Sequence, residues 1–179
     1  VVTMAGDMGD EILGGYPRYW KMMQPDYLLK MIGKEQIESW DDIIALWITR
    51  IKRPLAGFMM GGTLSKKDVS EELKKCYPDD LWNPKDPLAS YMALDCVTQV
   101  PEEFFMRNDK FGMAYGMEGR FPLATKMFME YCMSIPVSDK IGDNKANTKM
   151  PTKKAYLKIF EYTSSKPIIK TTGLVSLIF

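Results

Sequence analysis

An acidic, glycine-interrupted turn directly after a short apolar run is the feature that most constrains this sequence. The run, residues 1 to 4, is uncharged and rich in β-branched side chains, so residues 1 to 5 are predicted to form a buried strand. In open α/β sheets, ligands bind at the carboxyl ends of such strands. We therefore expect residues 5 to 18, which follow this strand, to form a site rather than a simple connection.

The residue types in this turn indicate what it would bind. Gly6 and Gly9 let the backbone bend tightly and approach a ligand, and Asp10 and Glu11 suit the first turn of a helix. A carboxylate does not bind phosphate unaided, so a nucleotide here requires Mg²⁺ between Asp10 and the phosphate oxygens. The alternative is that Asp7 and Asp10 are only a turn former and a helix cap.

A second block lies at residues 101 to 123, which read P-E-E-F-F-M-R-N-D-K-F-G-M-A-Y-G-M-E-G-R-F-P-L. With the earlier G-D-x-G-D-E-x-x-G-G-Y-P-R-Y run, it resembles two signatures of the asparagine synthetase family. Those signatures are Ser-Gly-(Glu or Asp)-Gly-(Gly or Ser)-Asp-Glu before Gly-Gly-Tyr, and Leu-Pro…Asp-Arg-x-(Ser or Gly)-Met-Ala…Glu-x-Arg-x-Pro. The motifs occur in the family's order, and the resemblance covers residues 1 to about 125.

The resemblance implies a fold and an activity. The fold is mainly α, the C-terminal helical portion of an α/β adenine-nucleotide (pyrophosphatase-type) synthetase domain, with one strand near the N-terminus. Residues 1 to 179 would then be a single domain or a domain fragment. The implied activity is that of a carbon–nitrogen ligase, which uses ATP and Mg²⁺ to convert aspartate to asparagine through an acyl-adenylate, with ammonia or glutamine as nitrogen source.

The resemblance also assigns roles to residues. Asp7 stands near the reacting centre, and Asp10 is at the metal and pyrophosphate position. The remaining assignments are Gly6, Asp7 and Gly9 for the nucleotide, Arg107, Arg120 and Glu103 for the substrate, and Lys170 as the catalytic lysine.

The chain departs from the family pattern at several positions. Ala5 replaces a Ser, Met8 replaces a Gly and is expected to narrow the turn, and Lys170 lies one position early. The family's Ser-Gly-Gly-x-Asp-Ser phosphate loop and its glutaminase domain are not in this sequence, so we expect a missing N-terminal half as partner. The chain alone is expected not to make asparagine.

Two other functions remain open. The first is a non-catalytic helical binding or assembly module that keeps the family fold. A related ATP-dependent synthetase is the other reading, because β-lactam synthetases use the same scaffold on different carboxylates.

Composition excludes several classes of function. The chain lacks His, which removes Ser-His-Asp catalysis and imidazole zinc sites, and its net charge of +1 indicates neither a nucleic-acid nor a membrane partner. Three unpaired Cys and the absence of a membrane-length apolar run predict a cytoplasmic protein. Residues 138 to 170 carry eight Lys against three acids, which predicts either a solvated face or a phosphate contact.

The rest of the chain has helical patterns. Helices are expected at residues 26 to 35, after a capping box at residues 39 to 42, from Ser65 to Leu73, and at residues 88 to 99. Residues 54 to 63 and 77 to 87 are predicted loops. Pro101 is expected to reset the chain before the next helix, which starts with Glu102 and Glu103 and is mostly buried, because apolar residues dominate from Phe104 to Met117. Charges on that helix predict either an internal ion network of Arg107, Asp109, Glu118 and Arg120 or a pocket for an amino-acid carboxylate.

Overall fold

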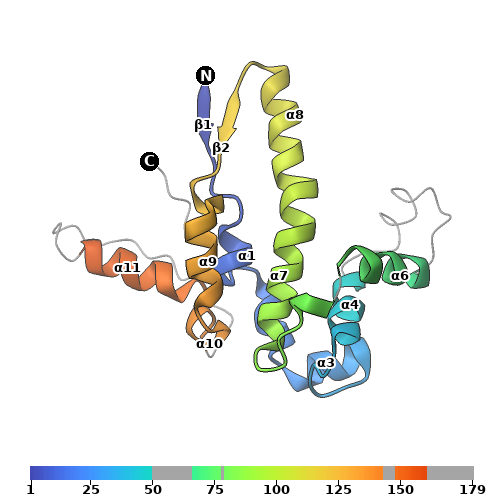
Figure 1. Cartoon of the computed structure of the whole chain (residues 1–179). Coiled ribbons are helices and arrows are strands. Elements are labelled where there is room, and N and C mark those ends of the chain that lie inside the picture. Colours follow the sequence, from blue (N-terminus) through green and yellow to red (C-terminus); the bar gives the residue numbers. More distant parts are fainter. Residues whose placement is uncertain (50–65, 78, 143–147, 161–179) are drawn as a thin grey trace. The chain divides into compact units, whose positions relative to one another are not determined.

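The computed structural model describes residues 1–49, 66–77, 79–142 and 148–160, and most of them are helical (Figure 1). The prediction of a mainly α fold with a strand near the N-terminus is confirmed. The chain forms two compact units, Val1–Lys21 with Asp95–Phe179, and Met22–Leu94. The predicted loop at residues 54 to 63 and the assigned Lys170 lie outside the described residues. In the described ranges, no helix has the length and hydropathy needed to cross a membrane.

The elements follow one another in a simple order. The unit that contains both ends of the chain has β1 (Val2–Met4), α1 (Gly9–Leu13), α2 (Pro17–Met22), η2 (Val100–Phe105), α8 (Met106–Ala114), β2 (Glu118–Arg120), η3 (Pro122–Ala124), α9 (Lys126–Ser134), α10 (Val137–Lys140) and α11 (Met150–Phe160). The Met22–Leu94 unit has α3 (Pro25–Ile32), α4 (Trp40–Ile48), α6 (Lys66–Cys76), η1 (Asp79–Leu81) and most of α7 (Pro87–Gln99).

β1 and β2 pair in parallel, with Val2 opposite Glu118 and Met4 opposite Arg120 (Figure 1). The prediction that the first strand is buried is wrong, because Val2 is 59% and Met4 71% exposed. β2 is the one strand that pairs with β1 among the described residues, and all three residues of β1 are exposed, unlike those of a strand inside a larger parallel sheet.

α1 is short but almost entirely buried, since four of its five residues are in the core. Ile12 and Leu13 belong to a hydrophobic cluster with Met8, Val100 and Cys132. Side chains of η2 and α9 complete this cluster, which therefore fixes the turn between β1 and α1 from behind. The partly buried members are Cys96, Phe104, Phe105, Ala124, Phe128, Met129 and Met133.

The helix predicted at residues 88 to 99 is present as α7, but Pro101 does not end it. The chain continues through η2, a π-helical segment, and on into α8 (Figure 1). Gln99, Phe105 and Met106 all have right-handed helical backbone angles. A π segment accommodates Pro101 because its longer-range hydrogen-bond pattern leaves backbone groups unpaired in any case.

α8 is also exposed, contrary to the prediction that the helix starting at Glu102 is mostly buried where apolar residues dominate, from Phe104 to Met117. None of its nine residues is buried, and Phe111 is 67% exposed. Apolar composition alone suggested burial. The first turn of α8 comes directly after η2, whose side chains pack in the core. The rest of α8 extends alongside β2 (Figure 1).

The Met22–Leu94 unit confirms the predicted capping box. The Ser39 hydroxyl accepts a hydrogen bond from the Asp42 backbone N–H at 3.3 Å, and the Asp42 carboxylate accepts one from the Ser39 N–H at 3.1 Å. On this helix, Ile44 and Ile48 are buried and Trp47 is half-buried. The cap thus begins α4 where its apolar face enters the core.

Ser39→Ala should lower the free energy of unfolding by about 1 kcal/mol, because two N-terminal amide groups lose part of their reciprocal cap. Urea unfolding followed by circular dichroism measures this. Thr125→Ala is the matched control, since Thr125 precedes α9 without a side-chain capping hydrogen bond. An equal loss in the two variants would contradict the role given to Ser39.

Candidate functional site

The predicted acidic turn joins the carboxyl end of β1 to α1. The Ala5 N–H donates to the Arg120 carbonyl at 2.9 Å, and the Gly9 N–H donates to the Gly6 carbonyl at 3.3 Å. A Cβ placed on Gly6 would meet no atom within 4 Å, so the space beside this residue is open. Asp10 lies in the first turn of α1, as predicted. The turn therefore presents its acidic residues where β1 ends.

Asp7 is held by a side chain that the sequence did not single out. Asn108 Nδ2 on α8 donates to Asp7 Oδ2 at 2.6 Å, which joins the first motif to the second. Both side chains are partly buried. A short hydrogen bond of this kind fixes the orientation of the carboxylate.

Asp10 is held from another direction. Lys149, directly before α11, places its Nζ 2.8 Å from Asp10 Oδ1. The contact passes over Gly15, where a Cβ would overlap both Asp10 Oδ1 and Lys149 Cε. At Gly14, φ is +72° and a Cβ would lie 2.7 Å from Ile141. The Gly-Gly pair after α1 is therefore required by a left-handed turn and by close packing.

Met8 was expected to narrow the turn, but its side chain does not lie in it. Its side chain is 2% exposed and belongs to the hydrophobic cluster, so it points away from the space that a ligand would use. Its backbone, however, has φ 77° and ψ −15°, in the left-handed region. The family pattern has glycine here, and methionine in this conformation is strained by about 1 kcal/mol.

A buried polar network lies behind the turn. The Tyr16 hydroxyl donates to Glu11 Oε1 at 2.7 Å, and burial raises the pKa of Glu11 despite this hydrogen bond. Arg18 Nη2 and the Tyr19 hydroxyl each lie 2.7 Å from Oδ2 of Asp95, whose side chain is fully buried. The Arg18 guanidinium also lies over the Tyr16 ring, 3.8 Å from its centroid.

Sequence reasoning missed this network, although a signal for it existed. Asp95 is the one acidic residue in the apolar helix at residues 88 to 99. A lone carboxylate in such a helix must find a cationic partner, and the Gly-Gly-Tyr-Pro-Arg-Tyr run offers Arg18. These residues hold the site in place without facing it.

The arginines assigned to the substrate lie close to the acidic turn along the backbone, but their side chains form local ion pairs. Arg120 is opposite Met4 at the end of β1, and Arg107 directly precedes Asn108, which binds Asp7. Arg107 pairs with Glu103 at 3.4 Å and Arg120 with Glu118 at 2.7 Å, and all four side chains are at least half exposed. In the described part of the chain, neither arginine makes an ion pair with Asp7 or Asp10. Among the described residues, the predicted ion network is therefore two separate local pairs, Arg107 with Glu103 and Arg120 with Glu118.

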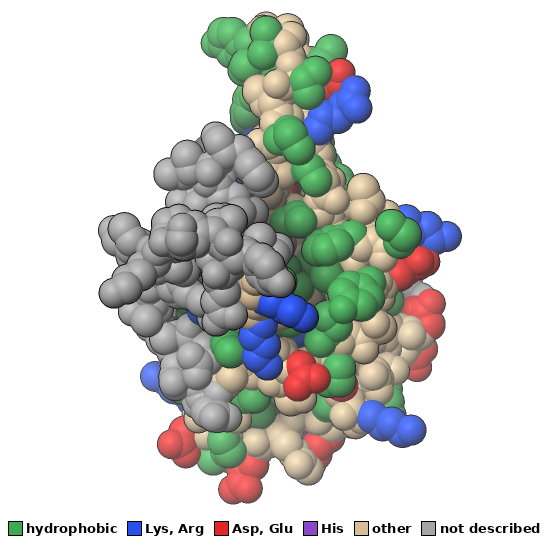
Figure 2. All heavy atoms as spheres, turned by 90° about the vertical axis from the view of Figure 1, so that its left-hand side faces the viewer, with side chains coloured by type: hydrophobic (Ala, Val, Ile, Leu, Met, Phe, Trp, Pro, Cys, Tyr) green, Lys and Arg blue, Asp and Glu red, His purple; other side chains and the backbone are tan. Residues whose placement is uncertain are grey.

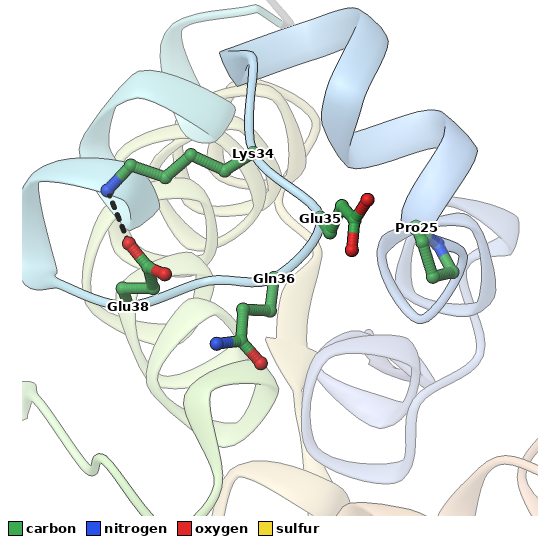
Figure 3. Close-up of a pocket in the computed structure, with 5 residues that line it drawn as sticks. All are labelled: Pro25, Lys34, Glu35, Gln36 and Glu38. Carbon is green, nitrogen blue, oxygen red and sulfur yellow. Dashed lines mark ion pairs between the residues drawn. The ribbon is translucent and has the colours of Figure 1, made fainter.

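A hollow of about 500 Å³ lies instead in the Met22–Leu94 unit, between the start of α3 and the connection from α3 to α4 (Figure 3). Lys34 and Glu38 form an ion pair of 3.0 Å at its edge. The other lining residues are Pro25, Glu35 and Gln36. None of these residues belongs to the predicted site, and their exposed, mixed charges define no ligand.

The oxygen and sulfur donors of the chain limit which metal ions it can hold. In residues 1–49, 66–77, 79–142 and 148–160, no three His, Cys, Asp or Glu side chains are close enough together to hold a metal ion. Mg²⁺ bound with a nucleotide needs only one or two carboxylates, because phosphate oxygens and waters complete its coordination. Asp10 suits that role by its chemistry, while its present partner is the Lys149 ammonium.

Reactive cysteine chemistry is not supported here. Burial raises the pKa of the Cys96 thiol to about 12, and it also raises the pKa of Cys132. A thiol that stays protonated at neutral pH is a poor nucleophile. The acidic turn is therefore the part of this unit that retains candidate chemistry.

A parallel strand that delivers an acidic, glycine-containing turn is typical of ligand sites in α/β proteins. A family model described as asparagine synthase matches residues 1–161. The chain belongs to the asparagine synthase family, and the match continues past residue 125, where the motif resemblance ended. No curated protein and no solved structure matches the chain.

The strain at Met8 predicts an unusual order of stabilities. Met8→Ala and Met8→Gly should both destabilise the fold by roughly 2 to 5 kcal/mol, because each removes a buried side chain. Met8→Gly should nevertheless be the more stable variant by about 1 kcal/mol, since only glycine relieves the positive φ. Urea unfolding measures both.

Glu130, an exposed residue in the middle of α9, is the matched control for this pair of variants. There, alanine should be more stable than glycine by about 1 kcal/mol, as in ordinary helices. The same order at Met8 as at Glu130 would show that the backbone at Met8 is not strained.

The contact between Asp7 and Asn108 predicts a charge-swap effect. Asn108→Asp should destabilise the fold by roughly 1 to 3 kcal/mol at neutral pH, because two carboxylates then face each other. The loss should shrink at acidic pH, where a protonated carboxyl donates the missing hydrogen bond. Asp7→Asn with Asn108→Asp should restore stability by reversing the bond, and a double variant no more stable than Asn108→Asp would contradict the contact.

Proposed function

We propose that this chain is the C-terminal, mainly helical part of an ATP-dependent synthetase domain that converts aspartate to asparagine. The observation that carries the proposal is the acidic turn at the end of β1, where Asp7 and Asp10 are each fixed by a side chain from a distant element. Membership of the asparagine synthase family supports the same conclusion. ATP and Mg²⁺ are the cofactors of this proposal, with a cytoplasmic location.

In the first step, a side-chain carboxylate oxygen of aspartate attacks the α-phosphorus of ATP. The bond from that phosphorus to the β,γ-pyrophosphate breaks, and an aspartyl-adenylate forms. Mg²⁺ bound with the nucleotide supplies neutralisation of the charge on the leaving pyrophosphate. We assign Asp10 to hold the ion, and we assign Gly6, which has open space beside its Cα, to approach the nucleotide. Gly9 is proposed to contact the nucleotide through its backbone, since its Cα packs against the Leu123 side chain.

In the second step, the nitrogen of ammonia attacks the activated acyl carbon, and the bond to AMP breaks. The attacking nitrogen loses a proton, for which a nearby base is required. We assign that role to Asp7, because the hydrogen bond from Asn108 holds one of its oxygens in place. Lys170 is proposed to stabilise the intermediate, and it lies outside the described residues.

Arg107, Arg120 and Glu103 are proposed to recognise aspartate. Arginine suits planar, bidentate binding of a carboxylate, and both arginines already bind a glutamate carboxylate. These local pairs are half exposed, so exchanging a glutamate for a substrate carboxylate involves little desolvation. Another carboxylate substrate, as in β-lactam synthetases, fits the same chemistry.

The remainder of the domain is the proposed partner. Exposed apolar side chains occur on β1, α8 and the connection to β2, among them Val2, Phe111 and Tyr115. Figure 2 shows hydrophobic side chains on the narrow upper projection, where the ends of β1, β2 and α8 lie. We propose that the N-terminal half, with its phosphate loop, covers this surface and that a glutaminase domain supplies ammonia.

A non-catalytic binding or assembly module is the second candidate. The same exposed apolar surface favours it, because a module that only associates with a partner also presents such a surface. Calorimetry with Mg·ATP and aspartate separates the two. Binding that weakens in Asp10→Asn supports the synthetase, whereas no heat with either ligand supports the module.

The isolated chain should form no measurable asparagine or pyrophosphate from ammonia, aspartate and Mg·ATP. One preorganised electrostatic donor contributes roughly a hundredfold to a thousandfold in rate, and the phosphate loop supplies several. Extending the chain with the upstream sequence of its source gene should restore both products, and Asp10→Asn should abolish them again. Substantial turnover by the isolated chain that Asp10→Asn removes would contradict the need for the missing half.

A further inference from the structure

The contact between Lys149 and Asp10 joins two elements that are far apart in the sequence. Asp10 is in the first turn of α1, and Lys149 immediately precedes α11. Their side chains approach to 2.8 Å and are 37% and 20% exposed, respectively. An ion pair that is this sheltered from solvent is screened less than a surface pair.

The backbone around the pair is adapted to it in two ways. Gly15 is the position at which any side chain would overlap both Asp10 Oδ1 and Lys149 Cε. Lys149 itself has φ 54°, a left-handed conformation that is uncommon for a residue with a side chain. Such conformations persist where the surrounding structure imposes them, and they occur frequently at ligand and switch sites.

The pair also decides what else Asp10 can bind. Lysine carries a compact point charge, and here it already neutralises the carboxylate that we assign to the metal. A divalent cation at Asp10 would meet the ammonium at close range, where like charges repel strongly. The cation and Lys149 therefore exclude each other from the same carboxylate oxygen.

We propose that Lys149 is a built-in counter-ion that competes with divalent cations for Asp10 and must leave this carboxylate before a metal-bound nucleotide can bind. The inference rests on the proposed function only for the assignment of Asp10 as the metal ligand. It gives a role to one lysine of the basic segment at residues 138 to 170, distinct from a solvated face.

Mn²⁺ binding to the whole chain without nucleotide tests this competition. Mn²⁺ prefers the same oxygen ligands as Mg²⁺, and electron paramagnetic resonance measures the free ion directly. Lys149→Gln should bind Mn²⁺ roughly fivefold more tightly than the unmodified chain at low salt, the equivalent of an ion pair worth about 1 kcal/mol. Lys149→Arg keeps the positive charge and should retain the weak binding of the unmodified chain.

Two controls locate the effect. Lys126→Gln removes the same charge from an exposed lysine that pairs with Glu130, and it should leave Mn²⁺ affinity unchanged. Asp10→Asn combined with Lys149→Gln should lose the gain. Should Lys149→Gln fail to fold, Lys149→Gly removes the ammonium, relieves the positive φ and should show the same gain.

The proposal is overturned if removal of the ammonium leaves Mn²⁺ affinity unchanged or lower, or if the gain persists without the Asp10 carboxylate. Calorimetry with Mg·ATP on the same variants separates this result from the proposed function. Tighter Mn²⁺ binding without any ATP binding would support the counter-ion and contradict the synthetase. ATP binding with Mn²⁺ affinity independent of Lys149 would do the reverse.

Discussion

The fully buried carboxylate of Asp95 is the constraint on which the site-bearing unit depends. It accepts from Arg18 and Tyr19, whose backbone follows directly after α1 and its two glycines. Removing one partner of such a buried pair leaves an uncompensated charge, which costs about 3 to 5 kcal/mol. The pair therefore fixes the segment after α1 against the helix that begins the second half of the unit.

That helix carries the constraint forward to the acidic turn. From Asp95 it continues through η2, whose Val100, Phe104 and Phe105 pack on the cluster around α1, and then into α8. Asn108 on α8 binds Asp7. The continuous helix from α7 to α8 therefore contacts the first motif at three places: after α1 through Asp95, at α1 through Val100, and before α1 through Asn108. The two sequence motifs are thus parts of one physical assembly, although about a hundred residues separate them.

Local signals in the sequence were sufficient for some elements and not for others. The Ser39 cap, α7 and the position of Asp10 in a first helical turn follow from short patterns, and each was predicted. The continuation of the helix through Pro101 was not predicted. η2 accommodates the proline through a π-helical hydrogen-bond pattern, which no single residue type indicates.

The errors of burial and the missed contacts have a common cause, since both depend on distant parts of the chain. β1 and α8 have the composition of buried elements, yet β1 is exposed at all three residues and α8 has no buried residue. Asn108 and Lys149 hold Asp7 and Asp10 across long separations that periodicity does not report. The conformation of Met8 was also not predicted. Its side chain packs in the core, while its backbone has the positive φ that glycine favours.

The exposed position of β1 has a consequence for the behaviour of the chain in solution. β1 pairs with β2 along one edge, and among the described residues nothing pairs with its other edge. A short, uncharged strand with an open edge is a template on which further strands can add, including β1 of another molecule. Self-association through this edge should therefore increase with protein concentration, and a covering segment that occupies the edge would also protect the chain from aggregation.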